Sequence, residues 1–167
     1  MDPKTRDRIP KGEMWCLAFD KEFAPWASLV FEMHEPHMWQ PGTVDYLNEL
    51  GVPVMMHDRY PGIERARRFP MERATRVMGR YFECSIVYML ALAFLRKAKD
   101  VALHGVSGTE AHNWQRPNIE YLIGMIRGQG RSVWIHPKST LLQPSQDGVY
   151  GVGNFNGDWQ MKELARA

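Results

Sequence analysis

One polar segment of the chain, residues 105–120, holds most of the side chains that can do chemistry. Glu110 and Glu120 can act as a carboxylate nucleophile or general base, and His112 can give or take a proton. Two carboxylates together with a histidine as proton donor are groups that cleave or transfer a glycosidic bond. The segment therefore predicts glycosyl chemistry, with Glu110, Glu120, His112 and the more distant His34 as candidate catalytic residues.

The same part of the chain offers groups that can hold a ligand. Gly105 lets a backbone approach closely, and Arg116 stands beside an expected helix start, where free N–H groups favour phosphate or carboxylate. Trp114 and Trp39 lie in polar loops and can stack on a base or sugar. The candidate ligand-binding residues are Ser85, Gly105, Ser107, Trp114, Gln115 and Arg116. The alternative is a capping loop, in which Asn113 or Gln115 satisfies the helix start and Arg116 pairs with Glu120.

A metal site is a further possibility raised by His34, His37 and Asp58, which are ligand types for zinc or manganese. No cysteine pair and no His-Glu-x-x-His pattern accompanies them, so we predict no metal and expect His34 to hydrogen-bond a substrate. The chain also lacks a Gly-rich dinucleotide fingerprint and a phosphate-loop signature, so no cofactor is expected.

The elements that must position these residues alternate along the chain. Apolar runs typical of buried strands are separated by segments with helical periodicity or helix start and stop signals. The expected strands are 14–19, 28–34, 52–57, 100–106 and 132–136, and the expected helices are 43–50, 71–81, 86–95 and 117–130. This alternation predicts an α/β fold, a three-layer Rossmann-like sandwich with a mostly parallel sheet of about five strands. A rival arrangement places 28–34 antiparallel at one edge, and 58–70 is expected to be an exposed loop.

Polar side chains follow every expected strand. Asp20 comes after the first strand, His34 after the second, His57 after the third, Ser107 after the fourth and His136 after the fifth. Because the carboxyl ends of parallel strands share one edge of the sheet, where ligands bind, we expect a site at that edge.

Length and composition suit one domain. The chain has 167 residues, of which 44% are hydrophobic and 24% charged. We expect a flexible leader at 1–12, the α/β domain at 13–143 and an irregular tail at 144–167 that folds against a partner. Cys16 and Cys84 lie in apolar runs and are expected to be reduced, buried thiols.

The net charge and the apolar stretches of the chain bear on which classes of partner it can bind. A net charge of +2 makes nucleic acid an unlikely partner, although residues 58–80 carry seven arginines and three acidic side chains, a local charge of +4. The longest apolar stretch, Ile86–Leu95, is half of what a bilayer span requires, and no signal-type region follows the N-terminus. We therefore expect a cytoplasmic protein without a membrane partner.

The order of several motifs resembles a known group of proteins. The motifs are Phe31-Glu32-Met33-His34, Val52-Pro53-Val54, Ser85 opening an Ala/Leu-rich helix, Gly105-Val106, the run Gln115–Gly124 and Gly130-Arg131-Ser132-Val133. Over roughly residues 13–143 they resemble small, mostly uncharacterised Rossmann-like proteins of tailed phages and prophages. The resemblance implies residence in the host cytoplasm if the chain is phage-encoded.

Two more distant resemblances concern parts of the domain. The Ser85 helix followed by a strand and Gly105-Val106 is similar to sialyltransferase-like and pterin-diphosphokinase-like domains, and the 118–130 helix is similar to that of nucleoside deoxyribosyltransferase-like proteins. Such domains usually carry an Asp after Gly-Val, where this chain has Ser107.

Three functions follow as hypotheses. The first is an enzyme that binds a nucleotide or nucleotide-linked sugar and transfers or hydrolyses a glycosyl bond. The second is a non-catalytic module that sequesters a nucleotide or binds a host or phage protein, and the third is a structural or nucleic-acid-associated phage component. A homo-oligomer is compatible with each of them.

Overall fold

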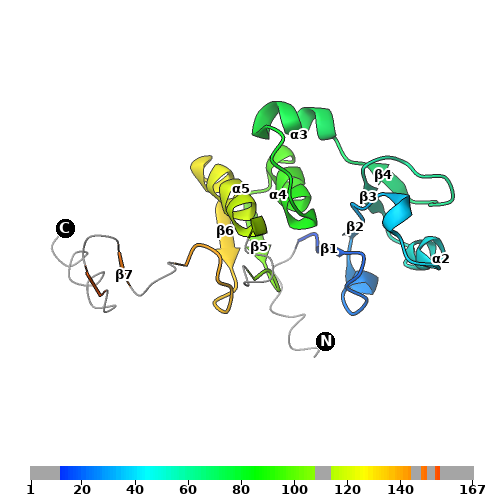
Figure 1. Ribbon diagram of the computed structural model, residues 1–167, viewed down its shortest axis with the longest axis horizontal. Helices are drawn as coiled ribbons and strands as arrows, with labels where there is room; N and C mark the ends of the chain where they lie inside the picture. The colour runs from blue at the N-terminus through cyan, green and yellow to red at the C-terminus, as the bar shows by residue number, and fades with distance from the viewer. Residues whose placement is uncertain (1–11, 108–113, 144–147, 150–152, 155–167) are drawn as a thin grey trace.

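The computed structural model describes residues 12–107, 114–143, 148–149 and 153–154, and Figure 1 shows its elements. The strands are β1 Trp15–Leu17, β2 Leu29–Phe31, β3 Val54–Met56, β4 Ala66–Arg68, β5 Asp100–Leu103, β6 Ser132–Ile135, β7 Gly148–Val149 and β8 Gly153–Asn154. The helices are η1 Ala24–Trp26, η2 Pro36–Met38, α2 Thr43–Glu49, α3 Met71–Met78, α4 Ser85–Leu95 and α5 Arg116–Gly128, of which η1 and η2 are short 3₁₀ helices.

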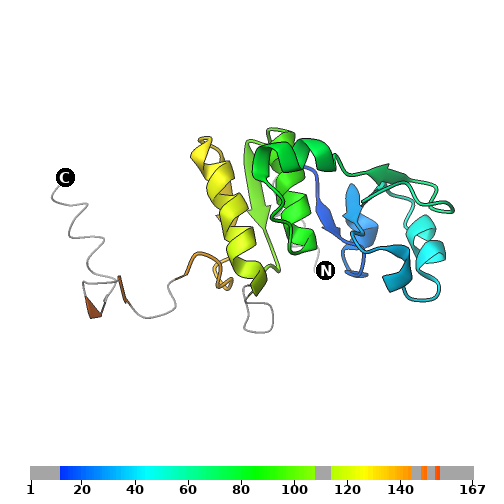
Figure 2. The same ribbon diagram turned by 45° about the horizontal axis from the view of Figure 1, so that its top comes forward.

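The main sheet is parallel throughout, in the order β1-β2-β3-β4. β5 and β6 form a separate parallel pair, which lies on the β1 side of this sheet in both views (Figures 1 and 2). The chain thus runs outward from β1 to β4 and then crosses back past β1 to β5. The predicted α/β class with a mostly parallel sheet is confirmed.

The rival arrangement of the sheet is excluded, and the expected loop at 58–70 was wrong in part. Residues 28–34 do not form an antiparallel edge, because β2 pairs in parallel with both β1 and β3 and is buried along its whole length. Residues 58–70 are not loop throughout, because β4 lies inside them and pairs with β3. β4 is an edge strand with two exposed arginines, so it lacks the apolar run that marks a buried strand.

Alternate side chains of the inner strands face two different cores. Leu29 and Phe31 pack into a large core formed with α3, α4, α5 and the β5–β6 pair, whereas Val30 packs into a smaller core with Leu47 of α2. This alternation is the period of two that a strand imposes on its side chains. The sheet is therefore covered on both faces, which gives the three layers expected of the sandwich.

Helix α4 forms the centre of the large core. Its residues Val87–Tyr88 and Leu90–Leu95 are buried, as its nearly continuous apolar sequence predicts. It spans eleven residues, and within the described part of the chain no helix is long and apolar enough to cross a membrane.

No described element covers one face of the β5–β6 pair. Trp134 is 45% exposed, although an apolar residue in a buried-type strand predicts a core position. It is exposed because Val133 and Ile135, on either side of it in the strand, point into the large core, so that Trp134 points the other way. The indole of Trp134 packs against the rings of His104 and His136, at centroid distances of 4.8 and 5.8 Å.

Both cysteines lie in the described part of the chain, whereas the two termini are described only in part. Cys16 is buried, Cys84 is half-buried, and both are free thiols, as predicted. The expected leader at 1–12 falls outside the described residues except for its last residue. Of the expected irregular tail, β7 and β8 are described, and they pair antiparallel.

Candidate functional site

Helix starts and strand ends meet at one edge of the molecule. α5 follows the carboxyl end of β5, and α4 ends only a few residues before β5 begins, so both helices start at the carboxyl edge of the strands. Neither first turn contains an acidic side chain, and among the described residues the side chain at the N-cap position of α5 does not hydrogen-bond the helix start. The positive ends of the two helix dipoles therefore lie at the carboxyl edge of the strands. In folds of this class, ligands bind at this edge where the strand order reverses, which here is between β1 and β5.

The most unusual group at this edge is the carboxyl of Glu32, directly after β2. The residue is 1% exposed, although glutamate is among the side chains least often buried. Its Oε1 accepts two hydrogen bonds from His34, one from the backbone N–H at 3.0 Å and one with Nδ1 at 2.6 Å. Its Oε2 is buried and has no hydrogen-bond partner among the described residues.

The contact between Glu32 and His34 prepares the imidazole for proton transfer. A carboxylate that accepts the Nδ1 proton holds the ring in the tautomer whose Nε2 is a free acceptor. The His34 side chain is 38% exposed, whereas that of Glu32 is fully covered. The arrangement is thus a buried orienting carboxylate behind an accessible histidine, a pairing that general acid–base catalysts use.

The loops around His34 are tied to one another. The Trp39 indole donates to the His34 carbonyl at 3.0 Å, and its ring meets Tyr60 edge-on. The Tyr60 hydroxyl donates to Glu35, and burial together with this hydrogen bond raises the tyrosine pKa. Because these contacts join the segments after β2 and β3, His34 is held by a connected framework.

An aromatic surface lies next to His34. Phe19, just after β1, is 58% exposed, and its ring centroid is 5.4 Å from that of His34. An exposed ring beside a proton-transfer group can carry a flat ligand by stacking. Trp39, which the sequence suggested for stacking, instead uses its indole N–H to fix the loop.

Helix α4 begins at Ser85, one residue before its expected start. Cys84 rather than Ser85 occupies the N-cap position, and Ser85 is the first residue of the helix. Burial raises the pKa of the Cys84 thiol, while hydrogen bonds from the Val87 and Ile86 N–H groups act in the opposite direction. The sulfur therefore sits at the helix start, close to the candidate residue Ser85.

Tyr88, one turn into α4, lies in an aromatic cluster that reaches the end of β3. Its ring is 5.1 Å from His57, 5.1 Å from Phe69 and 4.9 Å from Phe82. Burial raises the pKa of Tyr88, and the charges of Cys84 and Glu83 add to this effect. The cluster brings His57, a residue expected at the edge, against the helix that carries Ser85.

Arg116 and Glu120 contact each other, as the capping-loop alternative predicts. Arg116 Nε donates to Glu120 Oε1 at 2.7 Å, and its Nη2 donates to the Gln143 carbonyl at 2.5 Å. The same Glu120 oxygen accepts the Leu142 N–H at 2.6 Å. These contacts hold the 142–143 segment against α5, and both side chains remain about one-fifth exposed.

The remaining candidates are spread along the β5–α5 connection. Gly105 has φ +69, a left-handed conformation that glycine adopts most readily, and apart from the glycine and its two chain neighbours no described atom lies within 4 Å of the position that a Cβ would take there. Ser107 is exposed, and Trp114 is 60% exposed. Gln115 occupies the N-cap of α5 but makes no side-chain cap, so its expected capping role is not found.

Two candidate catalytic residues, Glu110 and His112, lie outside the described residues, as does Asn113. No group of three histidine, cysteine or acidic side chains that could hold a metal ion occurs in the part of the chain that the structure describes. The proposed combination of His34, His37 and Asp58 is therefore not assembled there.

Glu32 was missed as a functional residue by sequence reasoning. Its signal was a single charged residue that continues the apolar run Leu29–Phe31 and precedes Met33, which is also buried. An ionisable side chain next to such a run is either exposed at the strand end or buried at a cost that a functional role can explain. Only the packing of the neighbouring strands distinguishes these two cases.

No family model, curated protein or solved structure matches this chain, so the function is argued from the geometry of the site.

Proposed function

We propose that the protein is an enzyme that binds a nucleotide or nucleotide-linked sugar at the carboxyl edge of its sheet and transfers or hydrolyses a glycosyl bond. The observation that supports this proposal is the buried Glu32 carboxyl hydrogen-bonded to His34 at 2.6 Å. A buried carboxyl with one unpartnered oxygen costs stability, and such costs concentrate at functional sites.

In this proposal His34 transfers the proton. Protonated His34 gives its Nε2 proton to the leaving-group atom as the bond from that atom to the anomeric carbon breaks. A water molecule or acceptor hydroxyl then forms the new bond to the anomeric carbon, and its proton returns to Nε2. Glu32 orients the ring and stabilises its charged form between these two transfers.

The surroundings of His34 favour a flat, anionic ligand. The exposed ring of Phe19 offers a stacking surface for a base or sugar. The start of α5 has no side-chain cap among the described residues, and the N–H groups of such a helix start favour a phosphate. A nucleotide or nucleotide-sugar combines these two chemical features in one molecule.

A second candidate function is a module that binds such a ligand without turnover. It is favoured by the state of Glu120, whose Oε1 already accepts hydrogen bonds from Arg116 and Leu142. A carboxylate engaged in this way is less available as a nucleophile. Ligand binding without turnover is the outcome that separates this candidate from the first.

A thermal-shift screen against nucleotides, nucleosides and nucleotide-sugars is the first test. A ligand at a hundred times its dissociation constant adds about 2.7 kcal/mol to the free energy of unfolding. A ligand found in this way is then assayed for turnover by following release of the base or nucleotide. If no compound of these classes shifts the melting temperature, the proposal is wrong.

Three variants test the role of the dyad once a substrate is found. Glu32→Gln and His34→Asn should each lower kcat by about 10²–10⁴-fold, while substrate still shifts the melting temperature. His37→Asn, an exposed histidine three residues away, is the matched control and should keep turnover within about twofold. Full turnover by the His34 variant would transfer the catalytic role to another group.

A further inference from the structure

Apart from the dyad of Glu32 and His34, the molecule has an arginine-rich segment, residues 58–80. All seven arginines in it are exposed, in a segment that contributes a net charge of +4. Because the whole chain has a net charge of +2, the residues outside this segment sum to −2. The small total therefore conceals one basic surface on an otherwise slightly acidic chain.

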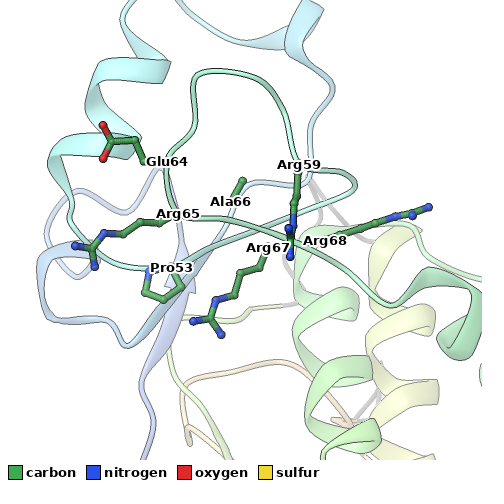
Figure 3. A pocket seen from close by; sticks show the side chains of 7 residues that line it. All are labelled: Pro53, Arg59, Glu64, Arg65, Ala66, Arg67 and Arg68. Carbon is green, nitrogen blue, oxygen red and sulfur yellow. The ribbon is translucent and has the colours of Figure 1, made fainter.

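Four of these arginines line a pocket at the free edge of the sheet. The pocket has a volume of about 620 Å³ and is formed by Arg59 from the β3–β4 loop, Arg65 just before β4, Arg67 and Arg68 on β4, and the smaller Pro53, Glu64 and Ala66 (Figure 3). β4 ends the strand order and pairs only with β3 in the described part of the chain. The pocket thus opens on a sheet edge that no described strand covers.

The arginines at the pocket are not neutralised by their neighbours. Arg68 lies 3.9 Å from Asp58, with both side chains 64% exposed, and this is the only ion pair that the seven arginines make within the described residues. An exposed pair of this length contributes little. The guanidinium groups thus remain available to an anion from outside.

The directions of the side chains indicate the shape of that anion. Figure 3 shows Arg65, Arg67 and Arg68 leaving the strand in different directions, with Arg59 descending toward them from the loop. Guanidinium groups that converge would enclose one phosphate, whereas groups spread along an edge suit a chain of phosphates. Three further exposed arginines follow along the chain, Arg73 and Arg76 in α3 and Arg80 just after it.

We propose that this surface, the pocket of Arg59, Arg65, Arg67 and Arg68 at the β4 edge, binds the phosphate backbone of a nucleic acid without regard to sequence. The proposal does not depend on the dyad of Glu32 and His34, because β4 stands at the outer end of the sheet, beyond β3. Charged residues also protect an exposed edge strand from pairing with other chains. That protective role predicts no binding, so the two explanations are separable.

Fluorescence anisotropy with a labelled single-stranded 20-mer, followed over a range of salt concentrations, tests the proposal on the full chain. Binding should be detectable at low salt and weaken linearly in log Kd against log salt. The double variant Arg65→Gln with Arg67→Gln should weaken binding by about tenfold or more and reduce the salt slope by about 1.4, since each lost contact with a single strand removes about 0.7. The melting temperature of the variant checks that it is folded.

A matched control removes the same charge elsewhere. Lys97→Gln with Lys99→Gln changes two exposed lysines in the connection from α4 to β5. Neither lysine lines the pocket at the β4 edge. This variant should bind within about threefold of the unaltered protein. Equal weakening by both double variants, or no binding of the unaltered protein at the lowest salt concentration, would overturn the proposal.

Competitors identify the chemistry that is recognised. Inorganic polyphosphate should displace the labelled strand, whereas polyaspartate at equal charge should not, because the arginine fork matches phosphate oxygens. Displacement by polyaspartate at equal charge would show that the site binds any polyanion and would refute phosphate recognition. A duplex of the same length shows whether the backbone must be single-stranded to reach the pocket.

Discussion

Asn118, fully buried in the first turn of α5, accepts the backbone N–H of Glu83 at 2.9 Å across 35 residues of sequence. Its amide nitrogen also donates to the Tyr81 carbonyl at 2.6 Å. One side chain therefore satisfies two backbone groups of the α3–α4 connection. This contact sets the position of the α4 start relative to the α5 start, the two helix ends that the proposed ligand site uses.

Replacing Asn118 should destabilise the protein. In Asn118→Ala two partly buried hydrogen bonds to backbone groups are lost, so the free energy of unfolding should fall by about 2–4 kcal/mol in urea denaturation. Asn48→Ala is a matched control, because Asn48 bridges the Gly62 carbonyl and the Glu64 N–H in the same way near the surface. Its cost should stay near 1 kcal/mol, where water can replace the amide. Equal losses would show that burial of the bridge is irrelevant.

Removing the partner of Glu32 should also cost stability. In His34→Ala the buried carboxyl loses the imidazole that contacts its Oε1, so we expect a loss of about 1–3 kcal/mol in the free energy of unfolding. His37→Ala, at an exposed site on the same loop, should change it by less than about 0.5 kcal/mol. Urea denaturation of both variants measures the difference, and a neutral His34 variant would mean that the carboxyl does not need the ring.

Alkaline pH should weaken the fold through Cys16. Burial, with a smaller contribution from the charge of Asp20, raises the pKa of this thiol from 9.0 to about 11. The folded state therefore keeps a proton that the unfolded state releases, so the contribution is complete below pH 9 and is lost as the pH rises toward 11. The free energy of unfolding should fall by about 2–3 kcal/mol for a thiol pKa raised from 9.0 to about 11.

Denaturation at pH 8, 9.5 and 11 checks this pH dependence. Cys16→Ala should show a shallower loss of stability between pH 9 and 11, although it starts from a lower value because its core position is less filled. The raised pKa values of Cys84, Tyr46, Tyr60 and Tyr88 act in the same direction and remain in the variant. Parallel curves for the two proteins would exclude Cys16 as a source.

Glu120 should hold the segment that follows β6. Its Oε1 accepts the Leu142 N–H and the Arg116 guanidinium, so Glu120→Ala should release residues 142–143 from α5. Hydrogen exchange at Leu142 should then accelerate by about tenfold or more, the loss of roughly 1.5 kcal/mol that a charged hydrogen bond contributes. Glu120→Gln retains an acceptor and should exchange at an intermediate rate. Unchanged exchange in the alanine variant would contradict this role.

The elements were predictable because their signals are local. The continuous apolar run of α4 and the spacing of Ile119, Leu122, Ile123 and Ile126 in α5 are properties of neighbouring residues, and all of these α5 side chains are buried. The same holds for the pairing of Arg116 with Glu120, which are four residues apart on one helix. Secondary structure and short-range pairs thus follow from spacing alone.

Burial and strand order were decided by contacts between distant segments. β4 is a strand because β3 supplies its hydrogen bonds, and Trp134 is exposed because no described element covers its side of the β5–β6 pair. Glu32 becomes a candidate functional group because its strand lies between β1 and β3, which removes the carboxyl from water. The sequence by itself determined the long helices, the apolar strands and the charges on them. The tertiary structure decided the edge strand β4 and which of those charges are buried, since strand pairing and solvent exclusion depend on neighbours far away in the chain.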